Sequence, residues 1–259
     1  GFKHPSLKVR AHLTQPLREL GMDAFRSGLA RWDAEARWDE SGYSMKGPVK
    51  AEGIEWRSDG FRLSNASLRA VASLTDGVVT LEQAVASGLG GTWSGRAEFR
   101  RWNHLKLDGV VSSVSLSSIV DAVPGAKLPW DGSISGPVSF TGELGPWGVR
   151  KAEASGRLEI RPAEARLPAE GAVNAAWRQD DGRITLIDSV IRLPASEVRL
   201  SGILGQSLNA ALTTRNLGEI EAVAALFLEN GLPISRYLEL KGGGASVDAV
   251  IDGPPRSPS

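Results

Sequence analysis

The sequence predicts an all-β fold, mainly antiparallel, with a few short helices. Three observations support this prediction: many segments alternate apolar and polar residues, turn signals separate them, and one pattern recurs about every hundred residues. Strict alternation is typical of strands with one dry and one solvated face. A long internal period is typical of stacked units. Together they predict an elongated, curled sheet (a β-taco) whose dry face lines a groove, built from repeats of about 100 residues.

The clearest strand covers residues 31–39. Its even positions are apolar and are expected to face the groove, namely Trp32, Ala34, Ala36 and Trp38. Its odd positions are charged and are expected on the outer face, namely Arg31, Asp33, Glu35, Arg37 and Asp39. The same alternation predicts strands over 138–144, 173–177, 198–204 and 247–251.

Turn signals separate these segments. Asp-Gly pairs stand between them at Asp59-Gly60, Asp76-Gly77, Asp108-Gly109, Asp131-Gly132 and Asp181-Gly182. Such pairs are the strongest short signal for a hairpin, although a glycine can also mark a bulge. Residues 56–60 and 177–182 both begin with Trp-Arg and end with Asp-Gly, which indicates one repeated element.

The repeat is anchored by three leucines. Leu17, Leu116 and Leu217 are 99 (116 − 17) and 101 (217 − 116) residues apart. Each follows an alternating segment and begins a short stretch with helical spacing. Asn216 and Glu219 resemble a capping box at the start of a helix predicted over 217–228, with a strand after it over 245–251. This divides the chain into a first repeat (1–106), a second repeat (107–207) and the start of a third (208–259).

Composition excludes several classes of function. Thirty basic residues balance thirty acidic ones and no basic stripe is visible, which argues against nucleic-acid binding. The absence of cysteine excludes disulfides and thiolate zinc sites. No apolar run of about 18 residues could span a bilayer. The chain does not begin with methionine and is interpreted as a piece of a longer protein, so any membrane anchor is expected outside it.

Motifs for catalysis, metal binding and cofactor binding are also missing, which predicts that the protein is not an enzyme and uses no cofactor. His4, His12 and His104 lack metal-ligand spacing. Residues 42–48 begin like a phosphate loop but place Pro48 where lysine is required. Residues 132–136 place Ile134 where a nucleophile elbow needs serine. The pair Asp180-Asp181 is interpreted as a polar turn, because Gly182 follows at once.

The apolar positions of the alternating segments are the candidate site. The tryptophans among them have two interpretations, which the sequence leaves open: Trp32, Trp38, Trp56 and Trp177 either pack as core or line a groove. Trp130 and Trp147, beside glycine or proline, are interpreted as turn anchors. The groove hypothesis predicts a wall made of Trp32, Ala34, Ala36, Trp38, Val138, Phe140, Leu158, Ile160, Val173, Trp177, Leu200, Leu204, Leu208 and Leu212.

The order of elements resembles a known family. Residues 107–142 contain an alternating strand, a short helix from Leu116, a Leu-Pro pair at 128–129, and a second alternating strand after Gly132. Residues 208–253 repeat this order from Leu217, with Leu-Pro at 232–233. This pattern resembles the AsmA-like superfamily, and within it the TamB-type proteins of diderm bacteria. The first repeat departs from the pattern, since its link is shorter and its glycines are differently spaced.

The resemblance implies a function in the cell envelope. It implies a protein anchored in the inner membrane that crosses the periplasm and shields phospholipid acyl chains on their way to the outer membrane. It also implies a partner, a BamA-related outer-membrane barrel, and no catalytic residues. Two alternatives stay open: a periplasmic scaffold that docks on such a barrel through its sheet edges, and a sugar-active β domain.

The physical need for such a groove follows from the hydrophobic effect. Each methylene exposed to water costs roughly 0.8 kcal/mol, so an acyl chain of about fifteen methylenes costs about 12 kcal/mol unshielded. A continuous dry lining removes most of that cost without binding tightly at any point.

Overall fold

A computed structural model describes residues 7–20, 23–39, 42–58, 60–101, 103–123, 132–145, 148–162, 168–220 and 243–253. The elements are β1 (Leu7–Pro16), the 3-10 helix η1 (Leu17–Leu20), β2 (Phe25–Asp39), β3 (Gly42–Ser58), β4 (Phe61–Thr75), β5 (Val78–Gly88), β6 (Gly91–Arg100), β7 (His104–Ser115), α1 (Leu116–Ala122), β8 (Gly132–Gly145), β9 (Gly148–Pro162), β10 (Glu170–Arg178), β11 (Ile184–Arg192), β12 (Ser196–Leu204), β13 (Ser207–Thr214) and β14 (Ala245–Asp252). Residues 217–220 are also helical.

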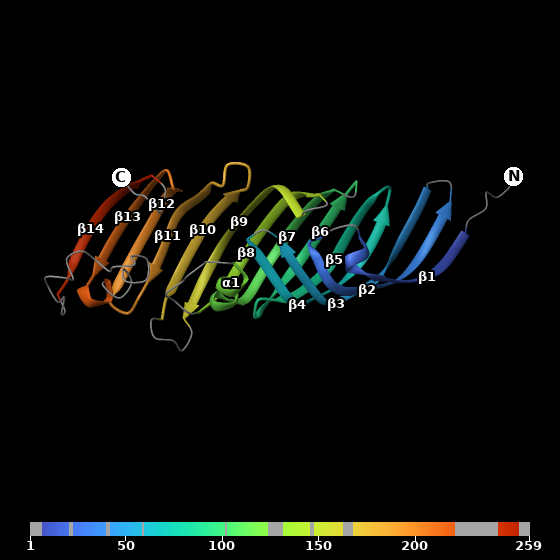
Figure 1. The fold of residues 1–259 in the computed structure, drawn as a ribbon, viewed down its shortest axis with the longest axis horizontal. Coiled ribbons are helices and arrows are strands. Elements are labelled where there is room, and N and C mark those ends of the chain that lie inside the picture. The colour runs from blue at the N-terminus through green and yellow to red at the C-terminus, as the bar shows by residue number, and fades with distance from the viewer. Residues whose placement is uncertain are drawn as a thin grey trace.

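All fourteen strands belong to one sheet, and their order in the sheet is their order in the chain (Figure 1). Every neighbouring pair is antiparallel, from β1–β2 to β13–β14. The predicted all-β, antiparallel fold with few helices is therefore confirmed. At about 4.8 Å between neighbouring strands, the thirteen spacings give a sheet roughly 60 Å long across its strands.

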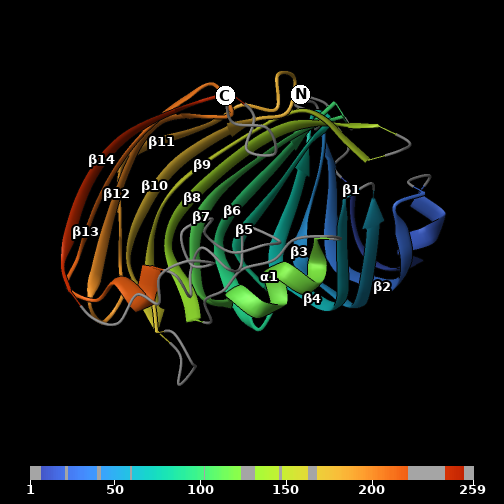
Figure 2. The same cartoon turned by 60° about the vertical axis from the view of Figure 1, so that its left-hand side comes forward.

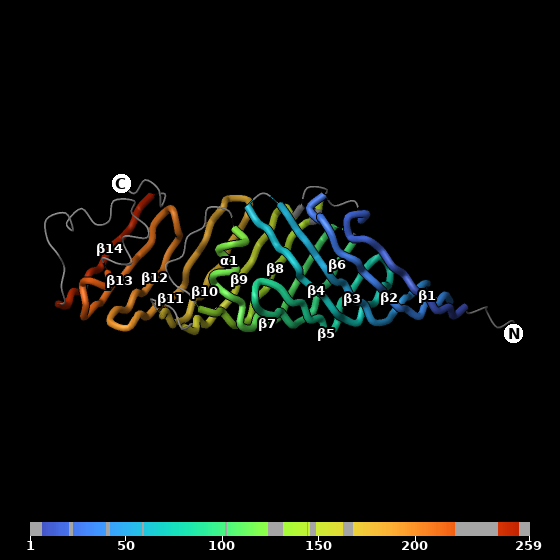
Figure 3. Tube along the Cα trace, turned by 60° about the horizontal axis from the view of Figure 1, so that its bottom comes forward, coloured from blue at the N-terminus to red at the C-terminus, as the bar shows by residue number. Residues whose placement is uncertain are grey.

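The strands are long and arched, and together they curl the sheet into an open half-pipe (Figure 2). The view in Figure 3 shows the same curl from another side, with β2–β4 in front of the more distant strands. Helix α1 lies under the arch, on the concave side of the sheet (Figure 2). The predicted elongated, curled sheet is thus confirmed.

The curl coincides with a regular set of β-bulges. Six strands contain one residue with φ between 44° and 61° at a point where the pairing register shifts: Gly53 in β3, Asn65 in β4, Gln83 in β5, Ser113 in β7, Lys151 in β9 and Asp188 in β11. A bulge inserts one extra residue, bends the strand and increases its twist. The bulges therefore account for how long strands form an arch rather than a flat ribbon.

The two rims of the sheet differ, because antiparallel strands turn at alternate ends. One rim, which we call the short-turn rim, carries six links, among them the two-residue turn Asp76-Gly77 between β4 and β5. The other, which we call the helix rim, carries η1, α1 and the helical residues 217–220. Six strands, β2–β7 and then β8–β13, separate these three helical links. The repeat length of about 100 residues, and the division at 106/107 and 207/208, remain predictions.

Some local predictions were correct. Asp76-Gly77 forms a hairpin with positive φ at both residues, as a type I′ turn requires. Asp181-Gly182 lies in the turn between β10 and β11. Short helices begin at Leu17 and Leu116, as expected. Trp130, Trp147 and the helix beyond residue 220 lie outside the described residues.

Other local predictions were wrong. Asp108-Gly109 lies in the middle of β7, since both residues pair across to β6 and β8. The segments 56–60 and 177–182 are not one repeated element, because the first ends at the helix rim and the second at the short-turn rim. Their likeness reflects hairpin chemistry, which recurs wherever a strand turns.

The capping box at Asn216 is half correct. The Asn216 Oδ1 accepts a hydrogen bond from the Gly218 amide at 3.0 Å, so asparagine does cap this helix start. The Glu219 carboxylate, however, does not reach back to residue 216. It accepts hydrogen bonds from the Ala195 amide at 3.2 Å and from the Ser196 hydroxyl. Glu219 therefore ties the helix start to the β11–β12 turn.

Candidate functional site: the apolar groove

Cross-strand pairing places an apolar row from each of the fourteen strands on one face of the sheet, while Val110, Ile187 and Val250 are exposed on the opposite face. Residues directly opposite one another in neighbouring strands share a face. Following the register from β1 leads from Leu13 to Trp32, Val49 and Ala70 in β1–β4. From Ala72, two positions along β4, the pairing continues to Leu204 in β12 through Leu81, Ala97, Leu107, Phe140, Ala154, Trp177 and Ile184. Leu200, Ala210 and Ala249 lie on the same face in the last strands. We call this surface the apolar face.

All fourteen predicted lining residues lie on the apolar face. They come from β2, β8, β9, β10, β12 and β13. Ala34, Ile160 and Leu208 are buried, Trp38 and Leu204 are exposed, and the other nine are half-buried. The structure therefore brings the predicted set together on one surface, where most of its members keep contact with solvent.

The prediction omitted the middle of the sheet. Strands β3–β7 contribute further residues to the same face, including Val49, Ala72, Leu81, Ala97 and Leu107. Their alternation is interrupted by two successive non-lining residues, as in Leu81-Glu-Gln-Ala84 and Val111-Ser-Ser-Val114. The second residue of each such pair is the bulge residue with positive φ. This apolar-polar-polar-apolar signature was the signal that could have identified these strands.

The apolar face is the concave one. Leu116 at the start of α1 is buried against Ile160, Ile191 and Leu193, and Ile134 and Val173 pack against the same cluster. Since α1 lies under the arch, the surface that it contacts is the inner surface (Figure 2). Small residues on this surface are almost wholly covered by their larger neighbours, as for Ala84 at 1 % exposed. The groove is therefore a curved apolar surface with α1 at its helix rim.

Aromatic side chains on this surface lie over glycines. The Trp32 indole donates a hydrogen bond from Nε1 to the Gly47 carbonyl at 3.2 Å. A Cβ atom added to Gly109 would lie 2.6 Å from the Trp93 Nε1, so this indole lies against the glycine backbone. Because glycine has no side chain, a flat aromatic ring can lie against the sheet at these positions. The ring then does not fill the groove above the apolar face.

Trp32, Trp38 and Trp177 lie on the apolar face. Trp56, opposite Leu63, packs edge-to-face on Phe25, with ring centroids 4.8 Å apart and an interplanar angle of 89°. A ring contact of this kind fits a packed core and a groove wall equally, so both interpretations of the tryptophans stay open.

The opposite surface, the polar face, carries alternating charges. Ion pairs on it include Lys106–Asp108 at 3.1 Å and Lys151–Glu143 at 3.1 Å. A hydrogen bond from Lys151 lowers the pKa of Glu143, and hydrogen bonds from Arg192 and then Arg199 lower the pKa of Glu197. Exposed pairs of this kind contribute little to stability, about 0–1 kcal/mol each. They keep the outer surface hydrated and close to neutral.

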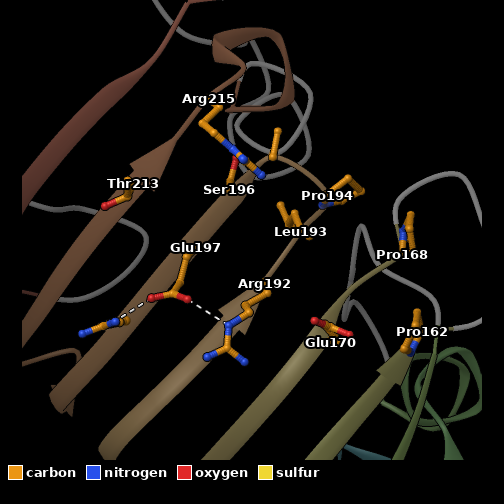
Figure 4. Close-up of a pocket in the computed structure, with 12 residues that line it drawn as sticks. Pro162, Pro168, Glu170, Arg192, Leu193, Pro194, Ser196, Glu197, Thr213 and Arg215 are labelled. Atoms are coloured by element: carbon orange, nitrogen blue, oxygen red, sulfur yellow. Dashed lines mark hydrogen bonds and ion pairs between the residues drawn. The ribbon is translucent and has the colours of Figure 1, made fainter.

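A cavity of about 720 Å³ lies on the polar face at the helix rim (Figure 4). The Glu197 carboxylate at its centre accepts hydrogen bonds from Arg192 Nε and Arg199 Nε, both at 2.8 Å. The Ser196 hydroxyl donates to the Glu219 carboxylate and lies 2.8 Å from the Thr214 hydroxyl, and neither partner is a histidine that could act as a base. Glu197, Arg192 and Arg199 therefore satisfy one another in this cavity.

Histidine chemistry is confined to one pair in the described chain. His12 Nδ1 lies 2.6 Å from Asp33 Oδ1, and both side chains are exposed on the polar face. His104 is exposed at the start of β7, and His4 lies outside the described residues. Across the ranges that the structure describes, no three histidine or carboxylate side chains are close enough to hold a metal ion. In the same ranges, none of the helices has the length and apolar character needed to cross a bilayer.

Comparison of the chain with models of protein families, with curated proteins and with solved structures finds no match.

Proposed function

We propose that the groove is a non-enzymatic conduit that shields the acyl chains of phospholipids. The observation that carries this proposal is the continuity of the apolar face from β1 to β14. An ordinary sandwich buries such a face against a second sheet. Here the described strands form a single sheet, and α1 covers only part of its concave side.

The chemistry of the wall suits acyl chains. Its side chains are aliphatic, aromatic or absent, as in the row formed by Gly109, Val138 and Gly156. Such a wall excludes water along a hydrocarbon chain but offers few hydrogen bonds to a sugar or a peptide. Without strong local contacts the chain can slide, because every position along the groove is similar in energy.

The dimensions also support the proposal. The groove is roughly 60 Å long across fourteen strands, whereas a whole bilayer core, two acyl chains deep, is about 30 Å thick. One molecule could therefore cover more than one lipid along its length. A large exposed apolar surface is uncommon in soluble monomers unless it serves binding.

The proposal is tested by placing a charge in the groove. Phe140→Arg in β8 puts a cation on the apolar face, and moving such a charge out of water costs several kcal/mol. We expect lipid that co-purifies with the protein, measured by mass spectrometry, to fall at least tenfold. The matched control is Thr141→Arg, the next residue, which faces the polar side and should leave lipid capture unchanged.

Circular dichroism spectra must show that both variants remain folded. Undiminished lipid capture in a folded Phe140→Arg protein would refute the conduit. Equal losses in both variants would attribute the effect to added charge rather than to the groove.

A second function, a scaffold for a BamA-related barrel, is favoured by the outer strands β1 and β14, each paired on one side only in the described chain. Edges of this kind accept an added strand. A barrel pull-down that survives Phe140→Arg but fails after proline substitution in β1 would favour the scaffold. The location in the periplasm of a diderm bacterium stays a prediction from the family resemblance.

A further inference from the structure

The two outer strands carry opposite charges. β1 contains no acidic residue, and its polar face presents Lys8, Arg10 and His12. β14 contains no basic residue, and its polar face presents Asp248 and Asp252. Neighbouring β13 places the uncharged residues Ala211 and Ser207 opposite these two aspartates. No ion pair to either aspartate occurs in the part of the chain that the structure describes.

The strand directions at the two edges, and the side on which each edge carries its apolar residues, are also compatible with pairing. Strands alternate in direction across the sheet, and fourteen is an even number, so β14 runs antiparallel to β1. If the β1 edge of a second copy followed β14, the new pair would be antiparallel, like every other pair in the sheet. The residues that β1 and β14 contribute to the apolar face are odd-numbered, so the apolar faces of the two copies would lie on the same side. Val250 is an exposed apolar residue on the polar face of β14, between its two aspartates.

One register satisfies charge and size together. Opposing Val9 with Ile251 and Leu13 with Val247 places large apolar residues opposite each other, with Ala11 against Ala249 between them. The same register puts Lys8 opposite Asp252, which is a pair of opposite charges. It also puts His12, which already contacts Asp33, opposite Asp248, and Arg10 opposite Val250. Opposite charges directly across a strand pair stabilise the pairing.

We propose that the chain associates head to tail, with the β14 edge of one copy pairing with the β1 edge of the next. The joined sheets form one continuous groove, and apolar residues at both ends lose their contact with water. These residues are among the most exposed apolar ones in the described chain, with Leu7 at 60 %, Val9 at 48 % and Val247 at 49 %. Because the contact uses two different surfaces, it is open-ended and produces rods rather than closed dimers.

The assembly is independent of lipid binding, so the first test uses delipidated protein. Analytical ultracentrifugation at low salt should show growing species as concentration rises. In about 1 M salt, where the Debye length falls to about 3 Å, association should weaken. Protein that stays monomeric at all concentrations would overturn the proposal.

Charge reversal identifies the edges. Lys8→Glu and Asp252→Lys should each weaken association at least fivefold, because each places like charges opposite one another. The double variant should recover most of the loss, since the two substituted side chains again carry opposite charges. Lys50→Glu, on the polar face of β3, is the matched control and should have no effect. Failure of the double variant to recover would overturn the assigned register.

Disulfide trapping gives an independent readout, because the chain has no cysteine. Ala11→Cys and Ala249→Cys face each other in the proposed register. Mild oxidation of the mixed variants should give a crosslinked dimer, and neither variant alone should. A dimer formed by Ala11→Cys alone would indicate β1–β1 pairing and would overturn head-to-tail association, while absence of any crosslink in associated protein would overturn the register.

Discussion

At each bulge, one residue with a left-handed backbone conformation keeps the apolar face continuous where the strand bends. Each bulge adds one residue. Because side chains alternate between the two faces, this extra residue alone would move every later side chain of the strand to the opposite face. In β5, Leu81 and Ala84 lie on the same face although they are three positions apart, because Gln83 absorbs the extra step with φ of 51°. The sequence pattern and the backbone conformation therefore together keep the apolar face continuous through the bulge.

This role predicts opposite effects of glycine at two neighbouring positions. Gln83→Gly should stabilise the fold by about 1 kcal/mol, since a left-handed conformation costs other residues roughly 1–2 kcal/mol. Thr80→Gly, in the regular part of the same strand, should destabilise by about 0.5–1 kcal/mol through the added freedom of the unfolded chain. Urea unfolding measures both changes. A loss of stability in Gln83→Gly would show that the bulge is not the source of strain.

Residue patterns predicted much of the fold. The alternation in 31–39 identified β2 and its inner face correctly, because a strand with one solvated side must alternate. The bulged strands were only partly identified, because alternation fails at a bulge and two adjacent polar residues look like a turn. Asp108-Gly109 was misplaced for a related reason: the close approach of the Trp93 ring requires glycine there, which sequence alone cannot distinguish from a turn.

At the scale of elements, α1 fixes the helix rim to the concave wall. Ser115 is its N-cap, and the Ser115 Oγ accepts a hydrogen bond from the Ser118 amide at 3.2 Å. The Ser115 amide in turn donates to the Leu89 carbonyl at 2.9 Å, which links α1 to the β5–β6 turn. The existence of this helix was predictable from spacing, but its position under the arch was not, because that contact depends on the curl.

The cap predicts a local effect. Ser115→Ala should destabilise α1 by about 1 kcal/mol, because an orphan amide at the helix start loses its acceptor. Hydrogen exchange of the α1 amides should speed up about fivefold, with the strands little changed. Asp121→Asn, an exposed position at the other end of the same helix, is the control. Equal acceleration in both variants would argue against the cap.

At the scale of the whole molecule, the polar face carries carboxylates with lowered pKa values. Arg100 lowers the pKa of Glu98, and Arg192 lowers that of Glu197, both from an ordinary value of 4.5. A lowered pKa in the folded state gives stability that is present above the unfolded value and is lost as the pH falls through the folded one. The sheet should therefore be less stable in acid.

We expect the melting temperature, followed by circular dichroism, to fall as the pH is lowered from about 6 to about 3, the range in which paired carboxylates become protonated. Glu197→Gln should reduce the size of that fall, since the variant has no carboxylate to protonate at this position. Glu52→Gln, at an exposed site on β3, should leave it unchanged. A melting temperature that is constant over this range would contradict the role of the ion pairs.

Strand order that follows chain order has a consequence for how such a protein can change in size. Each strand touches mainly the strands before and after it, so removing one adjacent pair would leave the remaining strands with the same direction and facing. Deletion or duplication of a hairpin in the gene would then shorten or lengthen the molecule by about 10 Å, two strand spacings, without redesign of what remains. The span of this architecture could thus be adjusted in evolution one hairpin at a time.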